Sequence, residues 1–231
     1  MIRSLLFTMI LFVSVPPYCF VVMAARLFGR RASFREARRW AAGIMWCCEK
    51  ICGLGMSVEG QENVPDEFGV VYFKHSSAYE TIAQFLIFPD QSWVLKRELM
   101  WAPFLGWALQ CLHPIAINRR SGRSAVEQVI EQGKTRLAEG MWVMIFPEGT
   151  RMAAGKTRRY GISGTLLAQR CGRLITPVAH NAGYFWPRRG LRKRPGTVRF
   201  VIGPPVDPAG RDPREVNEEI QAWMESTIAA M

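Results

Sequence analysis

The chain opens with a long uncharged segment. From Ser4 to Ala25 the sequence SLLFTMILFVSVPPYCFVVMAA carries no charged residue over 22 positions. About 20 apolar residues suffice to cross the hydrocarbon core of a bilayer as a helix, so the pattern predicts an N-terminal hydrophobic, membrane-anchoring helical segment. Pro16 and Pro17 remove backbone donors inside it, and a spanning helix and a re-entrant hairpin both agree with the sequence. A secretory signal peptide is less favoured, because only Arg3 precedes the run and no clear cleavage site follows it.

The next segment shows helical periodicity instead of a uniform apolar run. Within SFREARRWAAGIMWCCEKIC the apolar positions recur at intervals of three and four; they are Phe34, Ala37, Ala41, Ile44, Met45, Cys48, Ile51 and Cys52. Arginines occupy another face, and Trp40 and Trp46 suit the headgroup level of a membrane. The pattern predicts either a helix lying in the membrane interface or an amphipathic helix docked on a soluble domain.

Beyond Gly55, short β-branched and aromatic runs alternate with helical patterns. The predicted strands are residues 69–73, 92–96, 113–118, 141–146, 174–179 and 197–203. Two helices have start signals: the capping box Ser124-x-x-Glu127 and Asp212 before a proline. This alternation predicts a single α/β domain with a central sheet flanked by helices. We place its boundary near Met56, with an anchor and interfacial helix over 1–55 and the α/β domain over 56–231.

Charge narrows the range of partners. Lys and Arg outnumber Asp and Glu by 30 to 19, which leaves a net charge of +11 and favours anionic partners such as nucleic acid, a lipid surface or phosphorylated metabolites. No recognisable nucleic-acid module accompanies the charge, which counts against DNA or RNA. Arginines crowd the C-terminal side of the uncharged run, and such flanks stay in the cytoplasm. The six cysteines include no C-x-x-C pair and favour reduced thiols over disulfides or a metal site.

Polar chemistry follows two of the predicted strands. VVYF runs into Lys74 and His75, with Glu80 five positions beyond the histidine. A neutral imidazole can take a proton from a hydroxyl, and a carboxylate on its other nitrogen fixes the tautomer. The same carboxylate also completes the capping box Ser77-x-x-Glu80, in which it would bond only to a backbone N–H. Catalytic pair and helix cap both fit this stretch.

Two further segments offer anion-binding groups. MWVMIF runs into Pro147-Glu148-Gly149-Thr150-Arg151, where backbone N–H groups and a guanidinium can grip phosphate. AINRRSGRSA ends a strand and carries Arg119, Arg120 and Arg123 just before a predicted helix. A solvated turn and a solvated charge run are the plain alternatives. The carboxyl ends of strands in an α/β sheet usually form the ligand site, so these segments are expected to share one site with His75.

Taken in order, these segments resemble the membrane-bound glycerolipid acyltransferases, and among them the bacterial 1-acylglycerol-3-phosphate acyltransferases. The family's four blocks are N-H-x-x-x-x-D, I-D-R, F-P-E-G-T-R and a strand with P-V or P-I. They match KHSSAYE (74–80), INR (117–119), FPEGTR (146–151) and Pro177-Val178. A K-x-E-L…P-x-x-G segment matches Lys96 to Gly106. The resemblance covers roughly residues 58–207.

The resemblance implies a role for each matched residue. His75 is expected to deprotonate the sn-2 hydroxyl of a lysophosphatidic acid, and Glu80 to orient His75. The alkoxide then attacks the thioester of acyl-CoA or acyl carrier protein directly, with no metal or cofactor. Arg119 and Arg151 are expected to bind the acceptor's phosphate. The other implied substrate-site residues are Glu148, Gly149, Thr150 and, more weakly, Lys96. The implied location is the cytoplasmic face of a bacterial inner membrane.

The chain departs from the family pattern at three positions. Lys74 replaces Asn, Glu80 replaces Asp, and Asn118 replaces the Asp before Arg119. Glu80 keeps the charge, so the catalytic pair is retained, whereas Lys74 places a cation near His75 that could lower its pKa or contact a phosphate. Another lysolipid acceptor, such as a lyso-ornithine lipid or a lysophospholipid, is therefore an alternative. A non-catalytic basic membrane protein is a third, suited by the tract RRGLRKRP.

Overall fold

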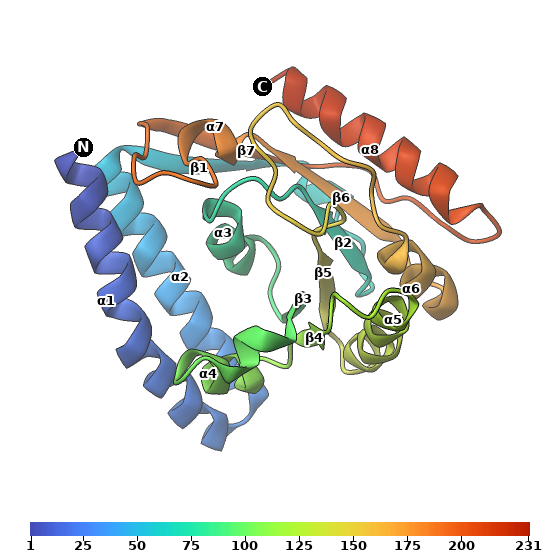
Figure 1. Cartoon of the computed structure of the whole chain (residues 1–231), viewed down its shortest axis with the longest axis horizontal. Helices are drawn as coiled ribbons and strands as arrows, with labels where there is room; N and C mark the ends of the chain where they lie inside the picture. Colours follow the sequence, from blue (N-terminus) through green and yellow to red (C-terminus); the bar gives the residue numbers. More distant parts are fainter.

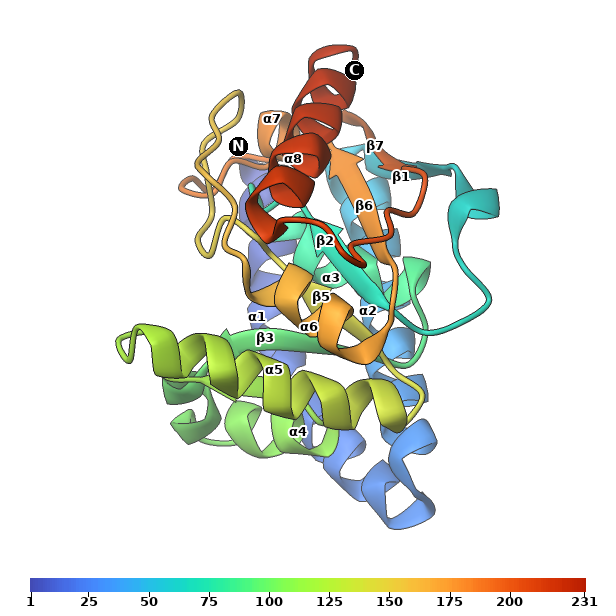
Figure 2. The same cartoon turned by 90° about the vertical axis from the view of Figure 1, so that its right-hand side faces the viewer.

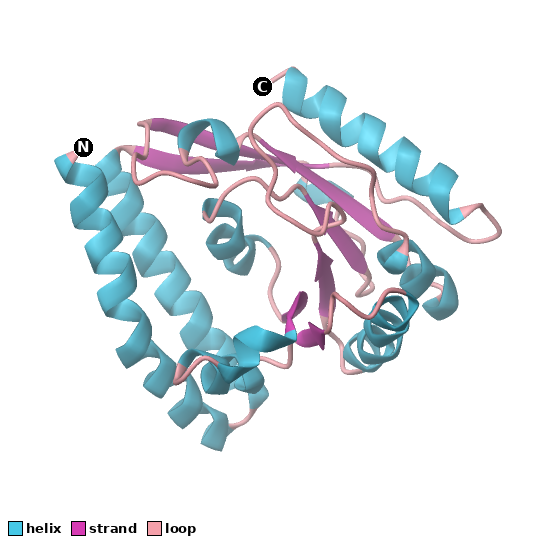
Figure 3. Cartoon of the chain, viewed as in Figure 1, coloured by secondary structure: helices cyan, strands magenta, loops and turns pink.

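A seven-stranded mixed sheet forms the centre of the protein, in a computed structural model that describes all 231 residues (Figures 1 and 3). The strand order is β1-β7-β6-β2-β5-β3-β4. Every neighbouring pair is parallel except β6 and β7, so β1 and β7 run against the other five strands. The strands are β1 (Leu54–Glu59), β2 (Val70–Phe73), β3 (Gln91–Lys96), β4 (Ile115–Ile117), β5 (Trp142–Ile145), β6 (Ile175–His180) and β7 (Gly196–Ile202). The α/β fold and all six predicted strands are confirmed.

Strand β1 was not predicted. It begins at Leu54, inside the Gly-Leu-Gly stretch that interrupts the alternation of apolar and polar residues. Its partner β7 lies more than a hundred residues away in sequence, and the register pairs Leu54 with Gly196. Only this long-range pairing makes a strand of the segment.

Two long N-terminal helices lie on one face of the sheet. Helix α1 (Ile2–Ala25) continues through Pro16 and Pro17 without a break, so no re-entrant hairpin forms within the run. A short 3-10 turn (Arg26–Phe28) and Gly29, at φ 97°, reverse the chain into α2 (Arg30–Cys52). Figure 1 shows the two helices side by side at the left. With its turn, α1 is the one segment long and apolar enough to cross a membrane, and 17% of its most apolar window is buried.

Helix α2 docks on the α/β domain, which is one of the two arrangements predicted from its sequence. Its apolar face packs against α3 (Tyr79–Ile87) and β1, and the residues predicted for that face are buried or half-buried. Trp46 is exposed, but Trp40 is partly buried and donates a hydrogen bond from Nε1 to Ser14 Oγ, 3.0 Å away on α1. The Trp40 indole therefore links α2 to α1.

The remaining helices complete two layers around the sheet. Helices α5 (Arg123–Ala138), α6 (Ser163–Cys171) and α8 (Pro213–Ala229) cover one face, as Figure 2 shows, while α1 to α4 cover the other. The shorter elements are α4 (Leu105–Cys111), α7 (Ala182–Phe185) and 3-10 turns at Gln61–Asn63 and Arg97–Trp101. Each face of the sheet carries its own hydrophobic cluster, of 21 and 18 buried residues. The sheet is therefore buried on both sides, as expected of parallel strands.

The two predicted helix starts have different outcomes. Asp212 caps α8 by accepting hydrogen bonds from the backbone N–H groups of Arg214 and Glu215, at 2.7 and 3.4 Å. The Ser124-x-x-Glu127 box does not form. The N-cap of α5 is Gly122, at φ 54° and two residues before Ser124, and Glu127 pairs with an arginine of α6 instead. The glycine turn sets the start of α5, so both residues of the box lie within the helix and do not cap it.

Candidate functional site

The order of the strands gathers the predicted site residues at one edge of the sheet. Strands β2, β5, β3 and β4 are consecutive neighbours and mutually parallel. Because their carboxyl ends meet at the same edge, His75 after β2, the FPEGTR loop after β5, Lys96 at the end of β3 and Arg119 after β4 come together. Segments separated by up to 76 positions in the sequence thus form one polar wall.

At its centre, His75 and Glu80 form a hydrogen-bonded pair. Glu80 lies in the first turn of α3, its side chain is fully buried, and its Oε1 is 2.9 Å from His75 Nδ1. An ionised carboxylate only accepts, so this contact assigns the proton to Nδ1 and leaves Nε2 as an unprotonated acceptor. The imidazole also stacks on Phe146, with ring centroids 4.0 Å apart. This is the geometry of a general base with an orienting carboxylate.

Glu80 also fulfils the capping role that competed with the catalytic one. The same oxygen, Oε1, accepts hydrogen bonds from the backbone N–H groups of Ser76 and Ser77, at 3.1 and 3.0 Å. Ser77 Oγ in turn accepts from the backbone N–H of Tyr79, at 3.0 Å. The hydrogen bonds expected from a helix cap and those expected from a paired histidine therefore form together, and the helix start fixes the carboxylate that fixes the imidazole.

The backbone around His75 is held from three directions. Its N–H donates to Glu148 Oε2 at 3.0 Å, and its carbonyl accepts from the N–H of Met152 at 2.7 Å. The carbonyl of Lys74, in the preceding peptide, lies 2.7 Å from His180 Nε2. The FPEGTR loop and the end of β6 thus clamp the two peptide groups that flank the His75 Cα.

His180 was missed in the sequence, although its position directly after the predicted strand LITPVA (residues 174–179) was a usable signal. It is buried, with 1% of its surface exposed, and its Nδ1 accepts from the N–H of Ala182 at 3.3 Å. Nε2 must then carry the proton and donate to the Lys74 carbonyl. Burial lowers the pKa of His180, which keeps the imidazole neutral and the pattern of bonds intact.

The expectation that Lys74 faces the site is wrong. Its ammonium is buried and points away from the imidazole, 2.9 Å from Glu148 Oε1, 2.5 Å from Glu225 Oε1 on α8 and 3.0 Å from the carbonyl of Lys156. Two carboxylates neutralise it, so it is not available to a phosphate. Burial raises the pKa of Glu148, while the Lys74 ammonium opposes that rise.

Glu148 supports the site from outside the cavity wall. Its side chain is fully buried, and both of its oxygens bond within the protein, Oε1 to Lys74 and Thr157 and Oε2 to the His75 N–H. It does not belong to the cavity wall. Its carboxylate, predicted as part of the substrate site, is therefore used to connect the FPEGTR loop, the base and α8.

The cations of the polar wall have few internal partners. Arg151 forms no side-chain hydrogen bond or ion pair, and its Nε is buried without a partner. Arg119 Nη1 donates to the carbonyl of Gly149 at 2.5 Å, and burial lowers the pKa of its guanidinium. Lys96 and Thr150 complete this part of the wall. Since guanidinium groups prefer bidentate anionic partners, Arg151 and the rest of Arg119 are free for an anion.

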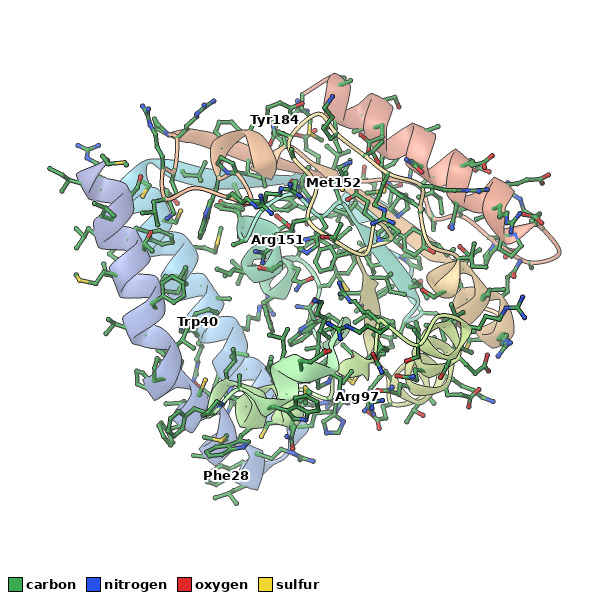
Figure 4. All side chains as sticks on the ribbon, in the orientation of Figure 1. Phe28, Trp40, Arg97, Arg151, Met152 and Tyr184 are labelled. Atoms are coloured by element: carbon green, nitrogen blue, oxygen red, sulfur yellow. The ribbon has the colours of Figure 1, made fainter.

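An apolar cavity of about 660 Å³ opens onto this polar wall. Seventeen of its 24 wall residues are hydrophobic, and most of them come from α1, α2, α3, α4 and β3. Helix α1 contributes Val15, Tyr18, Cys19 and Val22. Figure 4 shows Trp40 on α2 at one side of this region and Arg151 at the other. This cavity, the apolar chamber of the site, fits an amphiphile whose proton-donating group faces His75 and whose anionic group faces the arginines.

Comparisons with known proteins agree with this geometry. The acyltransferase family model matches residues 55–194. A 1-acyl-sn-glycerol-3-phosphate acyltransferase from Pseudomonas aeruginosa is 41% identical over 203 residues, 86% of this chain and 79% of that protein. One from Borreliella burgdorferi is 30% identical, over 71% of this chain and 68% of that protein.

The fold comparison points the same way. The crystal structure of the 1-acyl-sn-glycerophosphate (LPA) acyltransferase PlsC from Thermotoga maritima superposes with a TM-score of 0.81, over 99% of this chain and 94% of that one. At 23% sequence identity, it shows that the two chains share a fold. The family resemblance in the sequence is confirmed: the chain belongs to the acyltransferase family.

Proposed function

We propose that the protein transfers a fatty acyl group from an acyl thioester to the sn-2 hydroxyl of 1-acylglycerol-3-phosphate, and so forms phosphatidic acid for phospholipid synthesis. The observation that carries the proposal is the arrangement of three groups: an oriented base, an unpartnered arginine and an apolar chamber that meet at one edge of the sheet. The names of the two sequence relatives support the same acceptor.

In the reaction, the acceptor hydroxyl donates its proton to His75 Nε2 as its oxygen attacks the thioester carbonyl carbon. Glu80 stabilises the imidazolium that results, because its carboxylate lies 2.9 Å from Nδ1. The tetrahedral intermediate then collapses, the C–S bond breaks, and the departing thiolate takes the proton back from His75. General-base catalysis of this kind contributes about 10² to 10⁴ in rate. No acyl-enzyme, metal or cofactor is required.

The acceptor's phosphate belongs with Arg119 and Arg151, while Gly149, Thr150 and Lys96 surround it. Arg151 has no internal partner to displace, and Arg119 is held in place by a single bond to the Gly149 carbonyl. Glu148 supports this loop from behind. The acyl chains belong in the apolar chamber. The apolar helix α1, which lines this cavity, supports a location at a membrane, and the arginine-rich flank after α1 supports the cytoplasmic face of a bacterial inner membrane.

An acyl-transfer assay against a panel of lysolipids tests the proposal. Membranes containing the protein receive palmitoyl-CoA or palmitoyl-acyl carrier protein together with lysophosphatidic acid, a lyso-ornithine lipid or a lysophospholipid. We expect efficient transfer to lysophosphatidic acid and weak transfer to acceptors that lack a phosphate monoester. A preference for another lysolipid would replace the acceptor. No transfer to any of them would favour a basic membrane-binding protein without catalytic activity.

A further inference from the structure

Two loops beside the reaction centre are basic and contain no acidic residue. The first is residues 149–162, the part of the connection between β5 and α6 that follows Glu148, and the second, residues 186–195, joins α7 to β7. Six of their cationic side chains are exposed and form no ion pair. We call this set the basic rim: Lys156, Arg158, Arg188, Arg189, Arg192 and Arg194. The second loop contains the tract RRGLRKRP, which takes no part in the site described above.

The two loops contact each other at the mouth of the cavity. Arg188 Nη1 donates a hydrogen bond to the carbonyl of Arg151, at 2.6 Å, and Arg151 lines the cavity. Tyr184 Oη lies close to Gly155, 3.4 Å from where a Cβ of that residue would be. Figure 4 shows Arg151, Met152 and Tyr184 following one another in this region. The basic rim therefore begins where the polar wall of the cavity ends.

A buried lysine fixes the second loop to α1. Lys193 is 5% exposed, its N–H donates to Ser4 Oγ at 3.0 Å, and its ammonium contacts Thr8 Oγ1. The ammonium also lies 4.6 Å from the ring centroid of Trp186 and 5.4 Å from that of Phe7. Burying an ammonium is costly unless hydrogen bonds and cation–π contacts compensate for it. This loop is thus built into the fold, and the arginines beside Lys193 are presented outward from a fixed base.

The chemistry of the reaction indicates which anion meets the basic rim. In the proposed function, on which this inference rests, the acceptor's phosphate is already matched by Arg119 and Arg151. The other anionic reactant is the acyl donor. Acyl-CoA and acyl carrier protein both carry the acyl group on a phosphopantetheine arm, whose phosphate lies one extended arm away from the thioester. We propose that the basic rim binds the phosphopantetheine phosphate of the acyl donor and so guides the thioester to His75.

Direct binding tests the proposal without turnover. The probe is S-hexadecyl-CoA, a thioether that cannot transfer its chain, titrated into the full-length protein in micelles. We expect Arg189→Glu/Arg192→Glu to weaken its binding by about 10-fold or more, because each charge-assisted contact to a phosphate is strong. The neutral pair Arg189→Ala/Arg192→Ala should give a smaller loss. The control Lys134→Glu/Arg214→Glu makes the same change of charge at two exposed positions without ion pairs, and it should leave binding within about twofold of wild type.

Turnover then identifies the group that the basic rim recognises. For palmitoyl-CoA and palmitoyl-acyl carrier protein, the variant Arg189→Glu/Arg192→Glu, called the Glu pair below, should raise the donor KM while the KM for lysophosphatidic acid stays unchanged. For palmitoyl-pantetheine, which lacks the phosphate, the wild type and the Glu pair should have the same KM. An equal penalty with palmitoyl-pantetheine would overturn the proposal. So would unchanged donor binding combined with loss of the protein from sedimented membranes, since that result would make the basic rim a lipid-facing surface.

The two proposals fail in different ways. If lysophosphatidic acid is the wrong acceptor, transfer to it is absent in the wild type, but S-hexadecyl-CoA still binds and still depends on the basic rim. If the basic rim has no role in donor binding, transfer proceeds normally and the Glu pair behaves like its control.

Discussion

The proposed base His75 and the proposed phosphate-binding Arg151 share one wall of the cavity but are supported in opposite ways. His75 is held through its ring by Glu80, and the peptide groups around it are held by Glu148, Met152 and His180. Arg151, across the same wall, has no hydrogen bond or ion pair from its side chain. The contacts that hold His75 are thus all supplied by the protein, whereas the Arg151 guanidinium has no counter-ion within the protein.

The difference follows from what each group has to do. A base is effective only when its nitrogen is held within a few tenths of an ångström of the reacting proton, so its supports must exist in advance. An anion-binding arginine works in the reverse manner, because an internal carboxylate would compete with the ligand for the guanidinium. Lys74, next to His75 in the sequence, shows the contrast with Arg151. Two carboxylates pair with its ammonium, and the side chain is not part of the cavity wall.

Removing the base should have the largest effect. We expect His75→Ala to lower the rate of phosphatidic acid formation by about 10² to 10⁴ or more, since the hydroxyl then has no acceptor for its proton. The measurement is acyl transfer to lysophosphatidic acid in purified membranes, normalised to the amount of protein. A rate equal to that of the wild type would show that another group is the base.

Removing the open cation should affect the acceptor more than the rate of chemistry. A hydrogen bond to a charged group contributes about 1.5 to 3 kcal/mol, so Arg151→Ala should raise the KM for lysophosphatidic acid about 10- to 100-fold. Arg120→Ala is the matched control, because Arg120 is exposed and its side chain has no partner. If Arg151→Ala altered only the KM for the acyl donor, Arg151 would have to be assigned to the donor.

Loosening the support of the base should have a smaller effect, visible in kcat. His180→Phe keeps an aromatic ring against Phe73 and Phe200 but loses the donor to the Lys74 carbonyl. We expect kcat to fall about 10-fold with both KM values unchanged, and the free energy of unfolding to fall by about 1 to 3 kcal/mol, because a buried carbonyl is left without a partner.

Thr176→Val provides the control for that variant. Thr176 lies on the same strand, and its buried hydroxyl has no partner, so a valine of the same shape should not lower stability. We expect its kcat to equal that of the wild type. A similar loss of kcat in both variants would mean that the strand as a whole, and not the His180 hydrogen bond, determines the rate.

The smallest expected effect is on stability as a function of pH. Burial lowers the pKa of His180 in the folded protein, whereas an unfolded histidine titrates near pH 6.5. The unfolded chain therefore binds more protons below that pH, and the free energy of unfolding should fall by at most about 2 kcal/mol between pH 7.5 and 5. The ionisable groups around His180 are Glu80, His75 and Lys74. Thermal unfolding of the wild type and His180→Phe should show a smaller fall in the variant.

The sequence predicted the strands and the motifs at their ends because both are local. A run of β-branched residues is a strand wherever its pattern is buried, and FPEGTR follows β5 directly. The partners of Lys74 and Glu148 are not local. Glu225 lies 151 positions beyond Lys74, on a helix whose packing decides which way the lysine turns. No pattern near KHSSAYE contains that information.

The same limit applies to the dual role of Glu80. Its spacing from Ser77 fits a cap and its spacing from His75 fits a catalytic pair, and only the coordinates show one oxygen accepting from both. The capping box at Ser124 had an equally good pattern and did not form, because the helix is capped two residues earlier, at Gly122. Local rules identified the possibilities in both cases, and packing chose among them.

Helix α1 has a consequence for how this enzyme can change. Its sequence has the composition of an interchangeable membrane anchor, yet four of its side chains are part of the cavity wall. Exchanging α1 for an unrelated apolar helix of the same length would keep the hydrophobicity of the segment but alter the shape of the cavity. The sequence of α1 is therefore constrained by the shape of the cavity as well as by hydrophobicity. A segment whose composition is that of a simple anchor is thus also a part of the binding site.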